Sequence, residues 1–460
     1  MTPSRLATSR TSPAGSELEG AGPGATVTER IVRRIAANEA ELVELASALV
    51  GFDTTTRSED HEPAREEAAL QRFLADRLAS MGAEIDLWEP EPASLPEAPQ
   101  IPQGATFAGR PQLIARFPGR GYGKSVVLNG HIDVVSAEPR GLWGSDPFTA
   151  VVEGRRLIGR GTCDMKGGIA AMVMAMAALQ AEGIELAGDV LINTVTDEEI
   201  NGAGTVASLA RGLQADYGIV PEPSDLRLCT SNRGIVAGRI TFTGRPGHAD
   251  IPQPHWRDGG AVNAIEMAVP AIAALQDLRG RWIEQHDPGS PLPAGNIVPT
   301  TIKGGEWVVS YPSDCSFEVD VTYHPDQADS QGAGSGIRQQ IEQAVLGSAP
   351  DPGWEAQHPT DFTWYTDLPP VALPENHPLV EALVQVAGEL DLDPGTVAHP
   401  SWTDAASLTH AGIPSMVIGP TATRPDGSAT LHTIDEYVDI DDLLATAQIL
   451  ALAIVRLTGS

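Results

Sequence analysis

The sequence predicts an α/β protein whose sheet is largely covered by helices. Short apolar runs typical of buried strands alternate with stretches of helical periodicity, and this alternation is typical of strands joined through helices. Several of the apolar runs end in histidine or acidic residues, as strands do when a site lies at the edge of their sheet. The chain has 460 residues, longer than one ordinary domain, so we expect two domains.

The N-terminal elements follow in order. Residues 1–27 are rich in Ser, Thr, Pro, Gly and Ala, and predict a disordered tail rather than a signal peptide. Apolar residues at helical spacing predict a long helix over 27–50 and a second over 62–81. A strand is expected at 84–88, and the prolines of 89–112 predict a surface excursion.

Composition excludes some partners. The formal net charge is −31 and the sequence pI is about 4.6, which argues against nucleic acid and anionic membranes because both attract basic surfaces. The most apolar helical run, 169–179, is too short to span a bilayer. The three cysteines lack metal-site spacing and fit a reducing compartment, so we expect a cytoplasmic protein.

The stretch 125–168 organises the chain. An apolar run at 126–128 leads to His131 and Asp133, and a carboxylate at this spacing can accept the second ring N–H of a metal-binding imidazole. Asp164 follows in a glycine-rich loop that leads into a helix. Taken alone, the His-x-Asp pattern favours a surface turn with an incidental histidine.

Three more apolar runs end in polar residues. The run 190–195 leads to Glu198 and Glu199, 217–220 leads to Glu222, and 415–418 leads through a loop to His432. Because ligand sites gather beyond the carboxyl ends of strands in open α/β sheets, these residues and His131 are expected in one crevice. Each also has a simple structural alternative: a helix N-terminus for the glutamate pair, a turn for Glu222 and an exposed side chain for His432.

Histidine and carboxylate oxygens suit zinc, with manganese or cobalt as alternatives. Two such ions roughly 3.5–4 Å apart can share a bridging carboxylate and generate a hydroxide nucleophile near neutral pH. An acid left outside the coordination shell can then move the proton to a leaving amine. Glu198 and Glu199 are adjacent, which favours one as metal ligand and the other as general base.

These motifs carry a resemblance to a known family. In order, the chain reads Gly-His-Ile-Asp-Val-Val, Asp-Pro-Phe, Gly-Arg-Gly-Thr-Cys-Asp-Met-Lys-Gly-Gly, Thr-Asp-Glu-Glu, Pro-Glu-Pro-Ser, Gly-His-Ala and a terminal Gly-Pro followed by His-Thr-Ile-Asp-Glu. The chain from about residue 40 to 458 closely resembles the dinuclear zinc family of acetylornithine deacetylases, succinyl-diaminopimelate desuccinylases, aminoacylases and glutamate carboxypeptidases.

The resemblance implies a role for each site residue. His131 and Glu222 would hold one divalent metal ion, Glu199 and His432 the other, and Asp164 would bridge the two. Asp133 would orient His131, and Glu198 would be the general base that activates the bridging water. A cis peptide bond is implied between Asp164 and Met165, and Glu at position 222 fits the deacetylase and desuccinylase branch.

The resemblance also implies the domain organisation. A zinc-peptidase-like catalytic domain with a mixed sheet flanked by helices would comprise residues 28–234 and 356–460. Residues 235–355 would form an inserted ferredoxin-like α+β lid through which two copies form a homodimer. There we expect strands at 240–242 and 317–321 and helices at 261–278 and 337–346. His248 would then reach the neighbouring subunit's active site and stabilise the oxyanion.

One position departs from the family pattern. Several relatives carry an arginine in a lid strand that binds a substrate carboxylate, and Thr322 stands there in this chain. A hydroxyl cannot replace a bidentate guanidinium contact. Either another group, such as Arg233 or Arg245, takes that role, or the substrate lacks a carboxylate at this point.

The sequence therefore predicts a metal-dependent amidohydrolase that cleaves an N-acyl group from an amino acid or related amine, like an acetylornithine deacetylase or a succinyl-diaminopimelate desuccinylase. The alternative is a dipeptidase or carboxypeptidase of the same family. A non-catalytic relative is disfavoured because every expected ligand and the base are present. A structural zinc site is disfavoured because such sites are usually closed and cysteine-rich.

Overall fold

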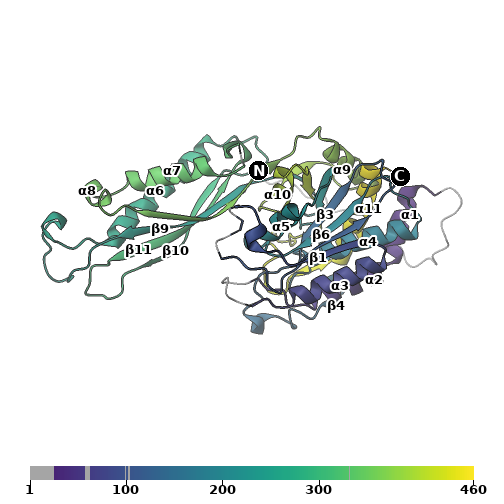
Figure 1. The fold of residues 1–460 in the computed structure, drawn as a ribbon, viewed down its shortest axis with the longest axis horizontal. Coiled ribbons are helices and arrows are strands. Elements are labelled where there is room, and N and C mark those ends of the chain that lie inside the picture. The colour runs from purple at the N-terminus through teal and green to yellow at the C-terminus, as the bar shows by residue number, and fades with distance from the viewer. Residues whose placement is uncertain (1–24, 57–62, 99, 102–103, 331, 460) are drawn as a thin grey trace.

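The computed structural model describes residues 25–56, 63–98, 100–101, 104–330 and 332–459. The chain forms a large lobe and a small lobe, and the small lobe extends away from the large one (Figure 1). Most of the predicted N-terminal tail, residues 1–24, and the predicted start of the second helix at residue 62 lie outside the described residues.

The large lobe is built on one mixed sheet of nine strands. Its main path runs β1-β2-β6-β3-β7-β15-β8-β13, and β14 pairs with β8. The strands are β1 (Glu84–Trp88), β2 (Gln112–Phe117), β3 (Val126–His131), β6 (Val190–Val195), β7 (Tyr217–Val220), β8 (Leu228–Asn232), β13 (Val371–Ala372), β14 (Thr396–Ala398) and β15 (Ser415–Val417). β6, β3, β7 and β15 are mutually parallel neighbours, so their carboxyl ends share one edge of the sheet.

Helices cover both faces of this sheet, as predicted. One face packs against α3 (Glu67–Ser80), α4 (Lys166–Ala181), α9 (Pro378–Glu389) and α11 (Ile440–Thr458), and the other against α5 (Ala203–Arg211) and α10 (Ala405–His410) (Figure 1). Two further helices, α1 (Val27–Ala37) and α2 (Glu39–Val50), pack on α4 and α11. On β3, Val126 and Leu128 belong to the first core and Val127 to the second. Because both faces are buried, the strand is apolar at every position of this run.

The small lobe is a four-stranded antiparallel sheet in the order β10-β11-β9-β12. Its elements in chain order are β9 (Gly234–Thr243), α6 (Ala264–Gln285), β10 (Asn296–Gly304), β11 (Asp314–Tyr323), α7 (Ser335–Gly347), α8 (Pro352–Glu355) and β12 (Asp361–Leu368). Apart from the short α8, the order β-α-β-β-α-β is that of a ferredoxin-like fold. The mixed sheet and the ferredoxin-like insertion confirm the predicted fold class.

A three-stranded sheet of β4 (Val151–Glu153), β5 (Arg156–Ile158) and β16 (Tyr437–Asp439) completes the large lobe. No helix in the described part of the chain is both long enough and apolar enough to cross a membrane.

Several predicted elements differ from the structure. The expected helix over 27–50 is two helices, because Asn38 ends α1 with a hydrogen bond from its backbone N–H to Ile35 and also precedes the first residue of α2. Asparagine favours such helix ends because its side chain competes for backbone hydrogen bonds. The second helix begins at Glu67, later than expected.

The expected surface excursion over 89–112 is partly buried. Phe107 packs against Ala203 and Ala207 of α5, and Arg110 forms an ion pair with Asp197, the residue before Glu198. The prolines correctly predicted irregular backbone, but this segment is not wholly on the surface. Part of it packs beside the loop that carries the predicted base.

The small sheet continues past residue 355, where the predicted lid ends. β12 pairs with β9 over Asp361–Leu368, and the chain returns to the large sheet only at β13. The alternation of Phe362 and Trp364 with polar neighbours is a strand pattern that marks this extension in the sequence.

Candidate metal centre

The centre of the large sheet brings the predicted ligands together. His131 is the last residue of β3, Glu198 and Glu199 follow β6, and Glu222 follows β7. Since β6, β3 and β7 are parallel neighbours, these four side chains come from one edge of the sheet. This is the placement expected for a site in an open α/β sheet.

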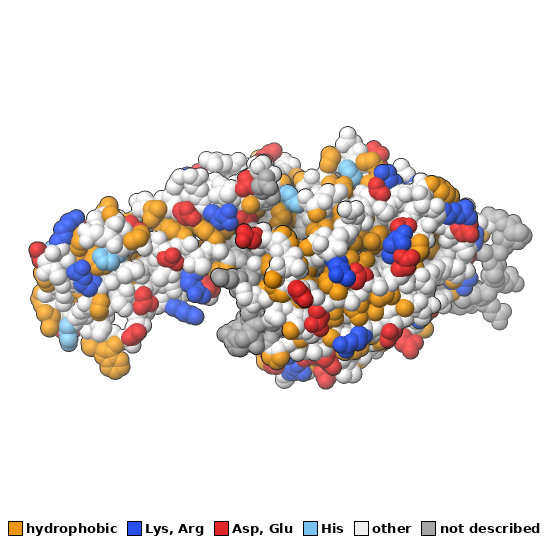
Figure 2. All heavy atoms as spheres, in the orientation of Figure 1, with side chains coloured by type: hydrophobic (Ala, Val, Ile, Leu, Met, Phe, Trp, Pro, Cys, Tyr) orange, Lys and Arg blue, Asp and Glu red, His pale blue; other side chains and the backbone are white. Residues whose placement is uncertain are grey.

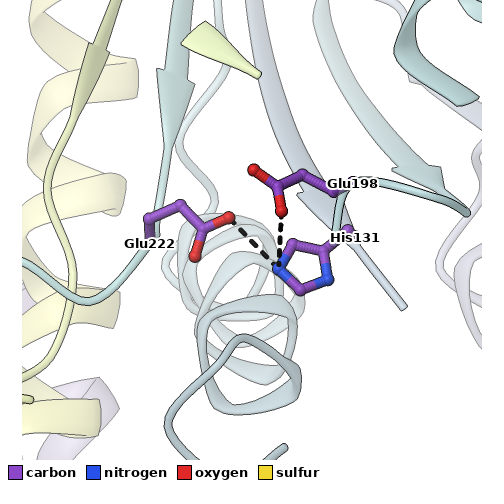
Figure 3. Close-up of side chains that lie close together, drawn as sticks. All are labelled: His131, Glu198 and Glu222. Atoms are coloured by element: carbon purple, nitrogen blue, oxygen red, sulfur yellow. Dashed lines mark ion pairs between the residues drawn. The ribbon is translucent and has the colours of Figure 1, made fainter. Parts of the chain in front are cut away.

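Carboxylates surround the ring of His131, whose side chain is only 1% exposed. Its Nε2 atom lies 3.1 Å from Asp164 Oδ1, 3.2 Å from Glu222 Oε1 and 3.9 Å from Glu198 Oε2. Figure 3 shows Glu198 and Glu222 pointing at this nitrogen from two sides. One ring nitrogen carries at most one proton, so it cannot satisfy three carboxylates by hydrogen bonding.

Asp164 lies between the two predicted histidine ligands. Its Oδ1 faces His131 Nε2 at 3.1 Å, and its Oδ2 faces His432 Nε2 at 3.3 Å. The same His432 nitrogen is 3.1 Å from both carboxylate oxygens of Glu199. Asp164 thus joins a group around His131 to a group around His432. The peptide bond between Asp164 and Met165 is cis, as the resemblance implied.

Asp133 holds this arrangement through two contacts. Its backbone carbonyl accepts a hydrogen bond from His131 Nδ1 at 2.8 Å, which leaves Nε2 directed at the carboxylates. Its buried carboxylate lies 3.6 Å from Nδ1 and accepts the backbone N–H groups of Glu198 at 3.3 Å and Glu199 at 3.2 Å. The orienting contact is therefore the carbonyl, while the carboxylate fixes the glutamate pair.

The crowding of acids is electrostatically costly. Burial, together with the neighbouring Asp164, raises the pKa of Glu222 to about 8 and that of Glu199 to about 7. Burial also raises the pKa of Glu198 well above its usual value. Burial opposes protonation of His432, but hydrogen bonds to Asp164 and Glu199 raise its pKa to about 10. Four carboxylates around two histidines thus hold an excess of negative charge that is unfavourable without cations.

Divalent metal ions fit these residues. Two groups have ligand atoms close enough together for one ion: His131 with Glu198 and Glu222, and His131 with Asp164 and Glu199. Glu222 Oε1 is buried and lies 3.2 Å from His131 Nε2 without forming a hydrogen bond of good geometry, although a buried carboxylate oxygen normally needs one. Imidazole and carboxylate donors are those that zinc, manganese and cobalt accept.

Comparison with known proteins shows the family of the chain. The sequence pattern of peptidase family M20/M25/M40 matches residues 127–456. The chain belongs to this family. The chain is therefore a hydrolase. Its relatives support a metal-dependent amidohydrolase activity.

Individual relatives show how far the similarity extends. The chain is 27% identical over 437 residues to N-formyl-4-amino-5-aminomethyl-2-methylpyrimidine deformylase of Halalkalibacterium halodurans, covering 91% of this chain and 95% of that protein. It is 27% identical over 404 residues to succinyl-diaminopimelate desuccinylase of Thioalkalivibrio sulfidiphilus, covering 85% and 94%. A tripeptidase from Staphylococcus aureus has the same fold, with a TM-score of 0.68, 20% identity and coverage of 91% and 98%.

Glu436 is a further residue beside this cluster that the sequence did not single out. Its Oε1 accepts the backbone N–H groups of Cys163 at 2.9 Å and Asp164 at 3.1 Å, and its Oε2 pairs with the buried Arg160 at 2.6 Å. It thereby fixes the backbone that carries Asp164. Glu436 ends the terminal His-Thr-Ile-Asp-Glu motif, and this position could have identified it as a candidate site residue.

His248 is not brought to the cluster within one chain. It lies in the loop between β9 and α6 of the small lobe, and its side chain is half exposed. It contacts Asp250, Ile251, Gln253 and Ser310 of the same lobe. His248 therefore does not line the cavity at the cluster in this structure.

Proposed function

We propose that this protein hydrolyses the amide bond of an N-acyl amino acid or related amine, using two divalent metal ions. His131 and Glu222 would hold one ion, Glu199 and His432 the other, and Asp164 would bridge them. The observation that carries this proposal is the position of Asp164, whose two oxygens face different histidines at 3.1 and 3.3 Å. Zinc is our first choice for both ions, and cobalt or manganese would suit the same donors.

The bound ions would polarise the amide carbonyl and make water a nucleophile near neutral pH. Glu198 would act as general base. Its carboxylate is directed at the cluster, and its side chain is 10% exposed, in contact with the cavity above the cluster. It would take the proton from the attacking water and donate it to the leaving nitrogen. Asp133 would keep Glu198 in place through the backbone N–H that it accepts.

The relatives support an acyl-amide substrate. One is named as a deformylase and another as a desuccinylase, and both names describe removal of an acyl group from nitrogen. The substrate is best identified with two panels, one of formyl, acetyl and succinyl derivatives of amino acids and one of dipeptides. Both panels are assayed with added zinc, cobalt or manganese. Release of free amine from one acyl class supports the proposal, whereas faster turnover of dipeptides would favour the dipeptidase alternative.

We also propose that two copies pair through the small lobe. β10 is an edge strand of the small sheet, and α6 packs beside it. Large apolar side chains are exposed on both elements: Ile265, Val269 and Ile283 on α6, and Val298 and Ile302 on β10. Figure 2 shows hydrophobic side chains exposed at the end of the small lobe that lies away from the large lobe. An exposed apolar edge of this kind is typical of an interface.

The double substitution Val269→Asp with Ile302→Asp should convert a dimer to a monomer. Two carboxylates would be buried without partners, which costs several kcal/mol. Light scattering coupled to gel filtration reports the mass, and Tyr122→Asp is the control because Tyr122 is 71% exposed on the large lobe. A wild-type protein that is already monomeric at micromolar concentration would contradict the pairing. If His248 serves the partner's site, the monomeric variant should also lose turnover.

A further inference from the structure

The cavity above the metal cluster has a volume of about 460 Å³. The cluster side chains form its floor, and residues 397–403 and 422–432 contribute walls. Most groups with formal charge on its surface are acidic. Among the residues that the structure describes, Arg227 is the one lysine or arginine that lines it.

Strand pairing explains why Arg227 lies at this cavity. It directly precedes β8, which runs antiparallel to β15, so β8 begins at the edge where β3, β6 and β7 end. The turn after Glu222 returns the chain to that edge. In this turn Asp225 and Leu226 adopt φ values of 57° and 55°, and the backbone N–H of Arg227 donates to the Ser224 carbonyl at 3.0 Å.

The guanidinium of Arg227 keeps donors for a ligand. Its Nη2 lies 3.3 Å from Asp393, but the two side chains are 39% and 57% exposed, and such surface pairs are weak. Its Nε is buried with no hydrogen-bond partner among the described residues. The nearby Asp225 does not neutralise it by direct contact, because that carboxylate accepts the N–H groups of Ala422 and Thr423 and the Thr423 hydroxyl.

The other candidates for binding a substrate carboxylate are engaged elsewhere. The Thr322 hydroxyl accepts the backbone N–H of Asn296 at 3.2 Å. Arg245 donates to the carbonyls of Trp256 and Gly260 and stacks over Trp354 inside the small lobe. Arg233 has a buried Nε without a hydrogen-bond partner among the described residues, as Arg227 does, but it donates to the carbonyls of Ala294 and Pro400 and does not line the cavity.

We propose that Arg227 binds a carboxylate of the substrate's amino-acid part, and that this chain prefers N-acyl amino acids to N-acyl amines without a carboxylate. This inference rests on the proposed amide hydrolysis at the same site. An arginine fork matches carboxylate geometry, and charge-assisted hydrogen bonds of this kind are about twice as strong as neutral ones. Arg227 would thus take the role of the lid arginine, whose position is occupied by Thr322 in this chain.

The test compares matched substrates. The N-acyl amino acid that wild type cleaves fastest is paired with its decarboxylated counterpart; for N-acetyl-L-methionine this is N-acetyl-3-(methylthio)propylamine. We expect kcat/KM to favour the carboxylate by roughly 10- to 100-fold in wild type, and Arg227→Met to abolish that preference by lowering kcat/KM for the carboxylate alone. Arg227→Lys should keep part of it, and Arg156→Met is a control cation that does not line this cavity.

A second readout is independent of turnover. Calorimetric binding of the free amino-acid product should weaken by roughly 10- to 100-fold in Arg227→Met and stay unchanged in Arg156→Met. Equal loss for both members of the substrate pair, no loss for either, or a wild-type preference for the decarboxylated amide would overturn the role of Arg227 while amide hydrolysis stands. Failure of wild type to cleave any N-acyl compound would instead refute the proposed function, and the inference with it.

Discussion

Glu198→Gln is expected to reduce kcat by roughly 100- to 10,000-fold, the usual contribution of a general base, while the protein keeps its metal ions. The amide cannot accept the proton from water, but it preserves the shape of a side chain that is 10% exposed. Amine release at saturating substrate gives kcat, and elemental analysis of the same sample gives metal content.

Glu375→Gln is the matched control, because Glu375 is exposed and makes no contact with the cluster. Two outcomes would contradict the assigned role of Glu198. Full activity in the variant would show that another group moves the proton. Loss of one equivalent of metal would show that Glu198 is a ligand, which its position near His131 and Glu222 also permits.

Asp164→Asn is expected to lower metal content from two ions per chain to one or fewer. The amide has a single neutral oxygen donor, so it cannot serve both the His131 and the His432 groups as the two carboxylate oxygens do. Loss of the metal's electrostatic contribution of several kcal/mol should reduce kcat/KM by at least roughly 1,000-fold.

Asp391→Asn provides the control for this pair of measurements. Asp391 is exposed and has a φ of 56°, a conformation that asparagine tolerates, so its fold and metal content should match wild type. An Asp164→Asn protein that holds two tightly bound ions would refute a bridging role. The circular dichroism spectrum of Asp164→Asn should match that of wild type, which would show that the variant has lost metal and not its fold.

The parts of the site that follow strands could be predicted from the sequence. His131 ends its strand, and Glu199 and Glu222 follow shortly after theirs. Parallel neighbours place such residues at one edge of the sheet. His432 follows its apolar run only through a loop, in which its own φ is 59°, so its place in the crevice was expected less directly and its pairing with Glu199 came from the resemblance. No periodic pattern specifies where such a loop returns.

Other features depend on long-range pairing that local patterns do not contain. The place of Arg227 follows from the antiparallel pairing of β8 with β15, which are separated by the whole small lobe in sequence. Glu436 supports Asp164 from the far end of the chain. The burial of Phe107 against α5 likewise depends on a tertiary contact, so its proline-rich surroundings predicted only a surface loop.

The most direct test of the central claim is a metal titration of wild-type protein. The protein is stripped with a chelator, the chelator is removed, and amine release from the preferred N-acyl amino acid is followed as zinc is added. We predict no activity in the metal-free protein and a rise that is complete at two zinc ions per chain. Full activity without metal, confirmed by elemental analysis, would contradict the account.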